Sequence, residues 1–185
     1  DVPVRWLDFE KSKQPLIGVI DTGFNGSNPD IDYSRVMLGK DYVDSDPIFL
    51  AVLNGSFIFV SDLLRCIDFN CKLSFVKMAS YEGTTSSGNV KTVLGLEENI
   101  CGKDVIIIED IIDTGLTLDS IIAEVDACGV KSLKTMALLY KPEAYCGSVK
   151  IDYVGWEIEN RFVVGYGMDY MGYGRNLKDI YKLKS

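Results

Sequence analysis

The chain contains no histidine among its 185 residues. This absence excludes histidine-dependent catalytic triads, most zinc chemistry and the H-E-x-x-H metalloproteases. Acid–base chemistry must therefore come from carboxylates, lysine, tyrosine or cysteine. The chain also has no apolar run near the roughly 18 residues that a membrane span requires, and no signal-peptide pattern at its start. We therefore expect neither a membrane partner nor secretion.

Cysteine pairs and excess positive charge are also missing. The five cysteines are odd in number and form no C-x-x-C pair: Cys66, Cys71, Cys101, Cys128 and Cys146. This usage is typical of reduced thiols in a cytoplasmic protein, and we expect small buried apolar residues at these positions. The net charge of -8 argues against a nucleic-acid partner, which usually requires a basic surface. A small anion is still compatible with it, because a helix N-terminus can bind phosphate in an acidic protein.

From about residue 47 onward, strand-length apolar segments alternate with amphipathic ones. This alternation predicts an α/β fold with a mostly parallel twisted sheet flanked by helices. The expected strands are 48–53, 73–78, 90–96, 105–108, 133–139 and 163–166. A helical face behind the first strand consists of Val60, Leu63, Leu64 and Ile67. Residues 80–90 are too rich in Gly, Ser and Thr for a core element, so we expect a mobile loop there.

The run from 105 to 118, VIIIEDIIDTGLTL, is the most informative part of the chain. Its four β-branched residues predict a buried strand that ends directly at the adjacent carboxylates Glu109 and Asp110. A polar turn at 113–115 follows, and then a helix that ends at Gly129. The apolar face of this helix consists of Leu118, Ile121, Ile122 and Val125. Turn and helix N–H groups suit a phosphate, and carboxylates suit sugar hydroxyls or a divalent metal, so the run predicts a site for a phosphorylated sugar.

Four further features accompany this run in a fixed order. They are Leu53-Asn54-Gly55-Ser56, Ser80-Tyr81, the strand-end Lys141, and the segment 162–170 with Arg175 behind it. With 109–117 they resemble the hypoxanthine (hypoxanthine-guanine) phosphoribosyltransferases over about residues 46–185. The resemblance implies the type I phosphoribosyltransferase fold, with a small C-terminal base-binding hood. It implies purine salvage, in which 5-phosphoribosyl-1-pyrophosphate (PRPP) and a 6-oxopurine (hypoxanthine, guanine or xanthine) give a nucleoside 5'-monophosphate and pyrophosphate. It also implies Mg²⁺ as cofactor and a cytoplasmic homodimer or homotetramer.

The resemblance assigns the PRPP contacts. Glu109 and Asp110 would bind the ribose hydroxyls, directly or through Mg²⁺. The 5'-phosphate would lie among Asp113, Thr114, Gly115, Leu116 and Thr117, and Asp113 would be the general base at purine N7. Leu53, Asn54 and Gly55 would form the pyrophosphate loop, with a cis peptide between the first two. Because Asn54 stands where some relatives carry lysine, its pyrophosphate contact would come mainly from the backbone.

The resemblance also assigns the base site, which would contain Ile111, Lys141, Phe162, Val163 and Asp169. Lys141 would contact the 6-oxo group, Phe162 would stack on the purine, and the Val163 backbone would read its edge. Asp169 would bind a second Mg²⁺, and Arg175 would contact pyrophosphate. The implied catalytic residues are Asp113, Lys141 and Arg175. Ser80 and Tyr81 would begin a loop that closes over the reaction centre and excludes water.

Residues 1–45 depart from this family. The stretches 15–24, 28–31 and 39–44 resemble the segment around the catalytic aspartate of subtilisin-like proteases. Asp21 nevertheless has no histidine and no matching serine segment with which to complete a triad. We therefore expect an atypical segment of uncertain role at 1–45, able to supply a strand at 16–20, ahead of a phosphoribosyltransferase domain at 46–185.

Two alternatives to a 6-oxopurine enzyme stay open. A non-catalytic, PRPP- or nucleotide-binding regulatory protein of the same fold would keep the PRPP loop and lose base-site residues. The presence of Lys141, Phe162, Asp169 and Arg175 favours the enzyme. A phosphoribosyltransferase for a different base is the second alternative. The spacing Gly83-x4-Gly88 does not indicate a nucleotide-binding P-loop, because the lysine and Ser/Thr that must follow are absent.

Overall fold

The computed structural model describes residues 9–11, 42, 45–79, 91–94 and 99–183. Its main feature is a six-stranded sheet in the order β4-β3-β2-β5-β6-β7. The strands are β2 (Ile48–Leu53), β3 (Lys72–Ala79), β4 (Lys91–Leu94), β5 (Asp104–Ile112), β6 (Ser132–Tyr140) and β7 (Tyr153–Glu157). All neighbouring pairs are parallel except β3 and the edge strand β4. The predicted α/β class with a mostly parallel sheet is confirmed.

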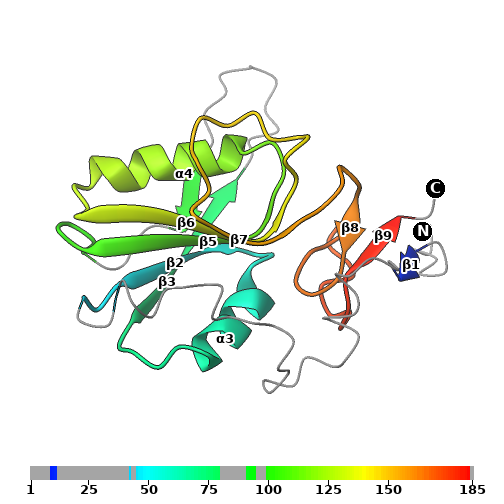
Figure 1. Ribbon diagram of the computed structural model, residues 1–185, viewed down its shortest axis with the longest axis horizontal. Coiled ribbons are helices and arrows are strands. Elements are labelled where there is room, and N and C mark those ends of the chain that lie inside the picture. Colours follow the sequence, from blue (N-terminus) through cyan, green and yellow to red (C-terminus); the bar gives the residue numbers. More distant parts are fainter. Residues whose placement is uncertain (1–8, 12–41, 43–44, 80–90, 95–98, 184–185) are drawn as a thin grey trace.

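One described helix covers each face of this sheet: α3 (Phe57–Arg65) on one side and α4 (Leu116–Ala127) on the other (Figure 1). Helix α3 buries Phe59, Val60 and Leu63, and the predicted position Ile67 lies beyond its end. Helix α4 buries three of its four predicted apolar positions, Leu118, Ile121 and Val125. The central strands therefore have apolar side chains on both faces, as in other sheets covered on both sides. In the described part of the chain, no helix is long and apolar enough to cross a membrane.

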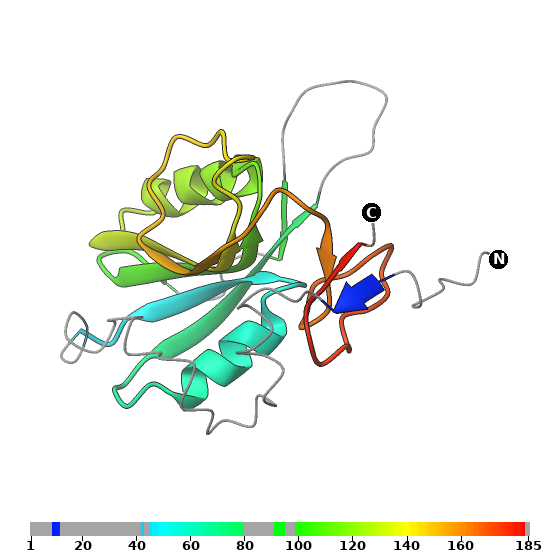
Figure 2. The same ribbon diagram turned by 45° about the vertical axis from the view of Figure 1, so that its right-hand side comes forward.

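A second, three-stranded sheet lies beside the main one, in the order β1-β9-β8 (Figure 2). It consists of β1 (Phe9–Lys11), β8 (Val163–Val164) and β9 (Tyr181–Leu183). The expected strand at 163–166 is shorter than predicted, because Gly165 and Tyr166 both adopt positive φ and end it. The short strands β1, β7 and β9 were not predicted. β1 pairs with β9, so part of the N-terminal segment contacts the C-terminal strand.

Three expectations fall on residues that the structure does not describe. They are the strand at 16–20, the protease-like stretches within 15–44, and the loop at 80–90 that includes Ser80 and Tyr81. The division of the chain at residues 45 and 46 stays a prediction.

The adjacent acids Glu109 and Asp110 lie inside a strand, so the predicted end of this strand was wrong. We expected the strand to end before Glu109, whereas β5 continues through Glu109 and Asp110 to Ile112. The pairing of Glu109 with Ala137 and of Ile111 with Leu139 holds this extension against β6. Inter-strand hydrogen bonds thus override the preference of two adjacent carboxylates for an exposed turn.

The cysteines correct a second expectation. Cys66, Cys101, Cys128 and Cys146 are exposed and Cys71 is half-buried, so none is a core residue. All five are free thiols. Their reduced state stays a prediction, and composition could not indicate their burial.

Asp104, at the start of β5, is expected to make the free energy of unfolding depend on pH. Its carboxylate accepts hydrogen bonds from Lys131 Nζ at 2.8 Å and Ser132 Oγ at 2.6 Å, and these lower its pKa. A lowered pKa stabilises the folded chain above the unfolded-state pKa of about 3.9, and this contribution is lost as pH falls through the folded-state pKa. We expect Asp104→Asn to lower the free energy of unfolding by about 1 kcal/mol at neutral pH.

Urea unfolding of both proteins between neutral and acidic pH measures this effect. The difference between wild type and variant should shrink as the medium becomes acidic. Asp126→Asn, at an exposed position near the end of α4, is the control. A difference that is independent of pH would show that the carboxylate charge of Asp104 is not responsible.

Candidate active site at the carboxyl end of the sheet

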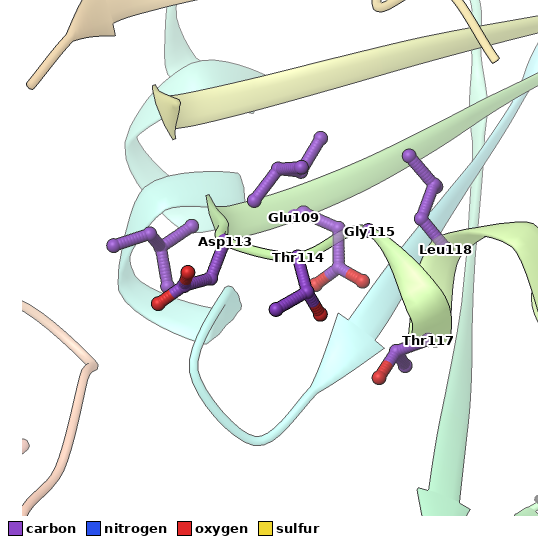
Figure 3. A pocket seen from close by; sticks show the side chains of 8 residues that line it. Glu109, Asp113, Thr114, Gly115, Thr117 and Leu118 are labelled. Atoms are coloured by element: carbon purple, nitrogen blue, oxygen red, sulfur yellow. The ribbon is translucent and has the colours of Figure 1, made fainter. Parts of the chain in front are cut away.

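A pocket of about 110 Å³ lies where β5 passes into α4 (Figure 3). Its lining residues are Glu109, Ile111, Ile112, Asp113, Thr114, Gly115, Thr117 and Leu118. Gly115 turns the chain at φ 85°, a left-handed conformation that glycine adopts without steric cost. The first helical hydrogen bond runs from Asp119 N–H to the Gly115 carbonyl, and no side chain in the described part of the chain caps the helix. The N–H groups before Asp119 therefore form an uncapped helix N-terminus at this pocket, which suits a phosphate.

Glu109 and Asp110 lie on opposite faces of β5, because neighbouring strand residues alternate in direction. Glu109 lines the pocket on the α4 side, whereas the Asp110 carboxylate packs against Gly55, just before α3. Burial and the nearby Asp110 charge raise the pKa of Glu109 well above its ordinary value. Burial raises the pKa of Asp110 to about 6, although N–H groups of Asp110 and Ile111 and the Arg175 charge oppose the rise. The two acids thus face different parts of the site.

Asp113 and Lys141 form an ion pair with 2.6 Å between Lys141 Nζ and Asp113 Oδ2. Lys141 directly follows β6 and its side chain is only 6% exposed, while that of Asp113 is 47% exposed. Lys141 N–H donates to the Ile112 carbonyl, which aligns the ends of the two strands. The structure therefore brings together the two residues that the family resemblance assigned to N7 and to the 6-oxo group of a purine.

The turn after β2 lies against Asp110. The Leu53–Asn54 peptide bond is cis, as the resemblance implied. A Cβ on Gly55 would lie 1.8 Å from Asp110 Oδ2, and a Cβ on Gly167 would lie 2.1 Å from the Gly55 carbonyl oxygen. The C-terminal segment, the turn and β5 are therefore in direct contact.

The predicted site residues of the segment 162–175 make contacts within that segment. Arg175 donates to Asp169 Oδ1 at 2.5 Å and to the Gly167 carbonyl at 2.7 Å. Asp169 Oδ2 also accepts a 2.6 Å hydrogen bond from Gly172 N–H, so both carboxylate oxygens have partners. Phe162 is 43% exposed, and its ring meets that of Tyr170 edge-on, with 5.5 Å between the ring centroids. Val163 begins β8 beside it.

Sequence reasoning missed three residues that shape this site. Gly167 contacts the turn at Gly55, Tyr166 donates to Asp62 Oδ2 of α3 at 2.7 Å, and Tyr145 covers Gly115. No spacing in the sequence indicates these contacts, because each joins segments far apart in the chain. The predicted residues Ser80 and Tyr81 lie outside the described residues.

The acidic residues of the site fit Mg²⁺ only in part. Mg²⁺ prefers oxygen ligands, commonly one or two carboxylates with substrate phosphates and water. Asp110 and Asp169 are the carboxylates available for this role, and the Asp169 charge contributes to the raised pKa of Asp110. Within the described residues no three His, Cys, Asp or Glu side chains form a ready-made metal site. The set therefore fits a metal ion that arrives with a phosphorylated ligand.

Comparisons with known proteins agree with this geometry. The model of the phosphoribosyl transferase domain matches residues 35–171 and so begins ahead of residue 46. The hypoxanthine-guanine phosphoribosyltransferase of Bacillus subtilis is 41% identical over 148 residues, which cover 80% of this chain and 82% of the relative. The hypoxanthine-guanine phosphoribosyltransferase of Streptococcus pyogenes is 40% identical over 148 residues, which also cover 80% of this chain and 82% of the relative.

Solved structures give the same result. A hypoxanthine phosphoribosyltransferase from Staphylococcus aureus superposes with a TM-score of 0.82 at 35% identity, covering 96% of this chain and 93% of the other. A Trypanosoma cruzi hypoxanthine phosphoribosyltransferase variant complexed with the product IMP gives a TM-score of 0.76 at 35% identity, covering 83% and 84%. With its fold, its pocket and these relatives, the chain belongs to the hypoxanthine-guanine phosphoribosyltransferases of the phosphoribosyl transferase domain family.

Proposed function

We propose that this chain transfers the 5-phosphoribosyl group of PRPP to N9 of a 6-oxopurine, giving the nucleoside 5'-monophosphate and pyrophosphate. The main supporting observation is the Asp113–Lys141 ion pair beside the pocket at the N-terminus of α4. This arrangement puts a carboxylate and an ammonium, suited to purine N7 and O6, next to a site suited to the 5'-phosphate. A regulatory protein that only binds PRPP would need the pocket at the N-terminus of α4 but not the Asp113–Lys141 ion pair.

In the proposed mechanism, PRPP binds with its 5'-phosphate in the pocket lined by residues 113–117. Glu109 on the pocket face and Asp110 on the opposite face of β5 hold the ribose hydroxyls from two sides. The backbone at Leu53–Gly55 and the guanidinium of Arg175 hold the pyrophosphate. Mg²⁺, when bound through Asp110 or Asp169, would supply positive charge to the departing pyrophosphate.

For the base, Phe162 supplies an exposed ring on which a purine can stack, with Ile111 and Val163 nearby in the proposed site. Lys141 donates to the 6-oxo oxygen, and Asp113 accepts or shares the N7 proton as N9 attacks the ribose C1'. Adenine carries an amino group at position 6, which donates and so cannot accept a hydrogen bond from Lys141. The proposal therefore includes a preference for 6-oxopurines.

A PRPP- and Mg²⁺-dependent assay with hypoxanthine, guanine, xanthine and adenine side by side tests this function. We expect turnover of hypoxanthine or guanine and at least about 100-fold lower kcat/KM for adenine, since an unmatched polar group in a buried site is strongly rejected. Activity on adenine alone would contradict the role of Lys141. No transfer to any base, with PRPP still bound in calorimetry, would favour the regulatory alternative.

The proposal has three further parts. Residues 46–185 form the catalytic domain, and 1–45 are an appended segment of which β1 pairs with β9. The chain assembles as a homodimer or homotetramer, which light scattering would measure. Its working compartment is the cytoplasm.

A further inference from the structure

The segment after Lys141 returns to the turn that begins α4. Cys146 N–H donates to the Thr114 carbonyl at 3.0 Å, and Ser148 N–H donates to Asp119 Oδ2 at 3.2 Å. These two hydrogen bonds lie on either side of Gly115 in the sequence. The segment 145–148 therefore holds both the entry to the phosphate-binding turn and the first turn of the helix.

Tyr145 lies directly against Gly115. A Cβ placed on Gly115 would come within 2.3 Å of Tyr145 Cε2 and 2.9 Å of Cδ2, so the ring occupies the space beside the glycine Cα. Tyr145 is absent from the residues that line the pocket. It therefore contacts the turn from behind and would act on a ligand only through Gly115.

The Tyr145 ring is itself fixed. It meets the ring of Tyr140, the last residue of β6, edge-on at 5.4 Å. Its hydroxyl donates to the Val149 carbonyl, and its backbone N–H donates to the Lys141 carbonyl at 3.1 Å. The ring thus connects the turn to the end of β6.

This support matters because glycine has little conformational preference of its own. Gly115 must stay at φ 85° for the following N–H groups to point into the pocket, yet an isolated glycine populates both signs of φ. Donors that are already held in place bind an anion without paying an ordering cost. A ring packed on Gly115 supplies this restraint.

We propose that Tyr145 is a positioning residue for the 5'-phosphate, which holds Gly115 and the N-terminus of α4 in the binding conformation. The inference rests on the proposed function for the identity of the ligand. It goes beyond that function by assigning a role to a side chain that touches neither substrate.

The test compares IMP with inosine, which differ only in the 5'-phosphate, by calorimetry on the full chain. In Tyr145→Ala we expect the preference for IMP over inosine to fall about tenfold, equivalent to the loss of one hydrogen bond to a charged group. The KM for PRPP should rise by a similar factor, with kcat and the KM for hypoxanthine nearly unchanged. A merely structural role would instead lower the melting temperature without changing the IMP-to-inosine ratio.

Two variants serve as controls. Tyr145→Phe keeps the ring on Gly115 and should retain the wild-type ratio. Tyr153→Ala removes a half-buried tyrosine ring at the start of β7, packed on the α3 side of the sheet, and should also retain it. An unchanged ratio in folded Tyr145→Ala, or in Tyr145→Leu if the alanine variant does not fold, would overturn the proposal. Equal affinity of the wild type for IMP and inosine would overturn it too. Absence of PRPP-dependent transfer alone would contradict only the proposed function.

Discussion

Replacing Asp113 with asparagine is expected to lower kcat about 100-fold and to leave the KM for PRPP nearly unchanged. Asparagine keeps the shape of the side chain but cannot accept the N7 proton. Asp113 lines the pocket and its side chain is about half exposed, so a bound purine can reach it. The same change removes the negative charge opposite the buried Lys141 ammonium. Both effects act on the transition state more than on PRPP binding.

Steady-state kinetics with PRPP and hypoxanthine varied separately would measure this change. Asp68→Asn, at an exposed position after α3, is the matched control and should behave as wild type. Near-wild-type turnover in Asp113→Asn would contradict the assignment of Asp113 as general base. A higher KM with unchanged kcat would assign it to binding alone.

Replacing Gly55 with alanine is expected to lower kcat/KM for PRPP about 100-fold, because displacement of a positioning group by about 1 Å can cost that much. The new Cβ would lie 1.8 Å from Asp110 Oδ2, well inside van der Waals contact. The turn also packs against the C-terminal segment, because Gly167 lies close to the Gly55 carbonyl. The Asp110 carboxylate must therefore move from its place beside the proposed ribose and pyrophosphate sites.

Gly102→Ala is the control for this variant. Its Cβ would meet no atom of the described residues within 4 Å, although its φ of 68° adds backbone strain that Gly55 does not have. It should lose some stability and keep its activity, whereas Gly55→Ala should lose activity. Normal kcat/KM in a folded Gly55→Ala protein would mean that the position of Asp110 is not critical for PRPP.

The sequence predicted the scaffold well because its central strands and α4 have strong local signals. The β-branched run at 105–108 and the helical spacing of Leu118, Ile121 and Val125 specify their elements with little help from the rest of the chain. Short strands such as β1 and β9 lack such signals, since they depend on partners distant in sequence. The cysteines show the same limit, because their exposure depends on which neighbours the fold places around them.

Most residues of the candidate site could also be predicted from the sequence. Local order along 109–117 indicated a phosphate turn preceded by acids, and a family resemblance added Lys141, Phe162, Asp169 and Arg175. Their roles stay predictions. Sequence alone placed the two acids together at the end of a strand, whereas β6 holds them within β5 and strand alternation directs them to opposite faces.

The sequence by itself therefore determined the α/β class, the position of the turn proposed for phosphate and the identity of the acidic, basic and aromatic groups. Those features follow from residues close together in the chain, where spacing and propensity act directly. Only the tertiary structure decided which groups meet: Lys141 with Asp113, Asp110 with Gly55, and Tyr145 with Gly115. These contacts join segments that become neighbours only when the parallel strands align, so they depend on packing that no local pattern encodes.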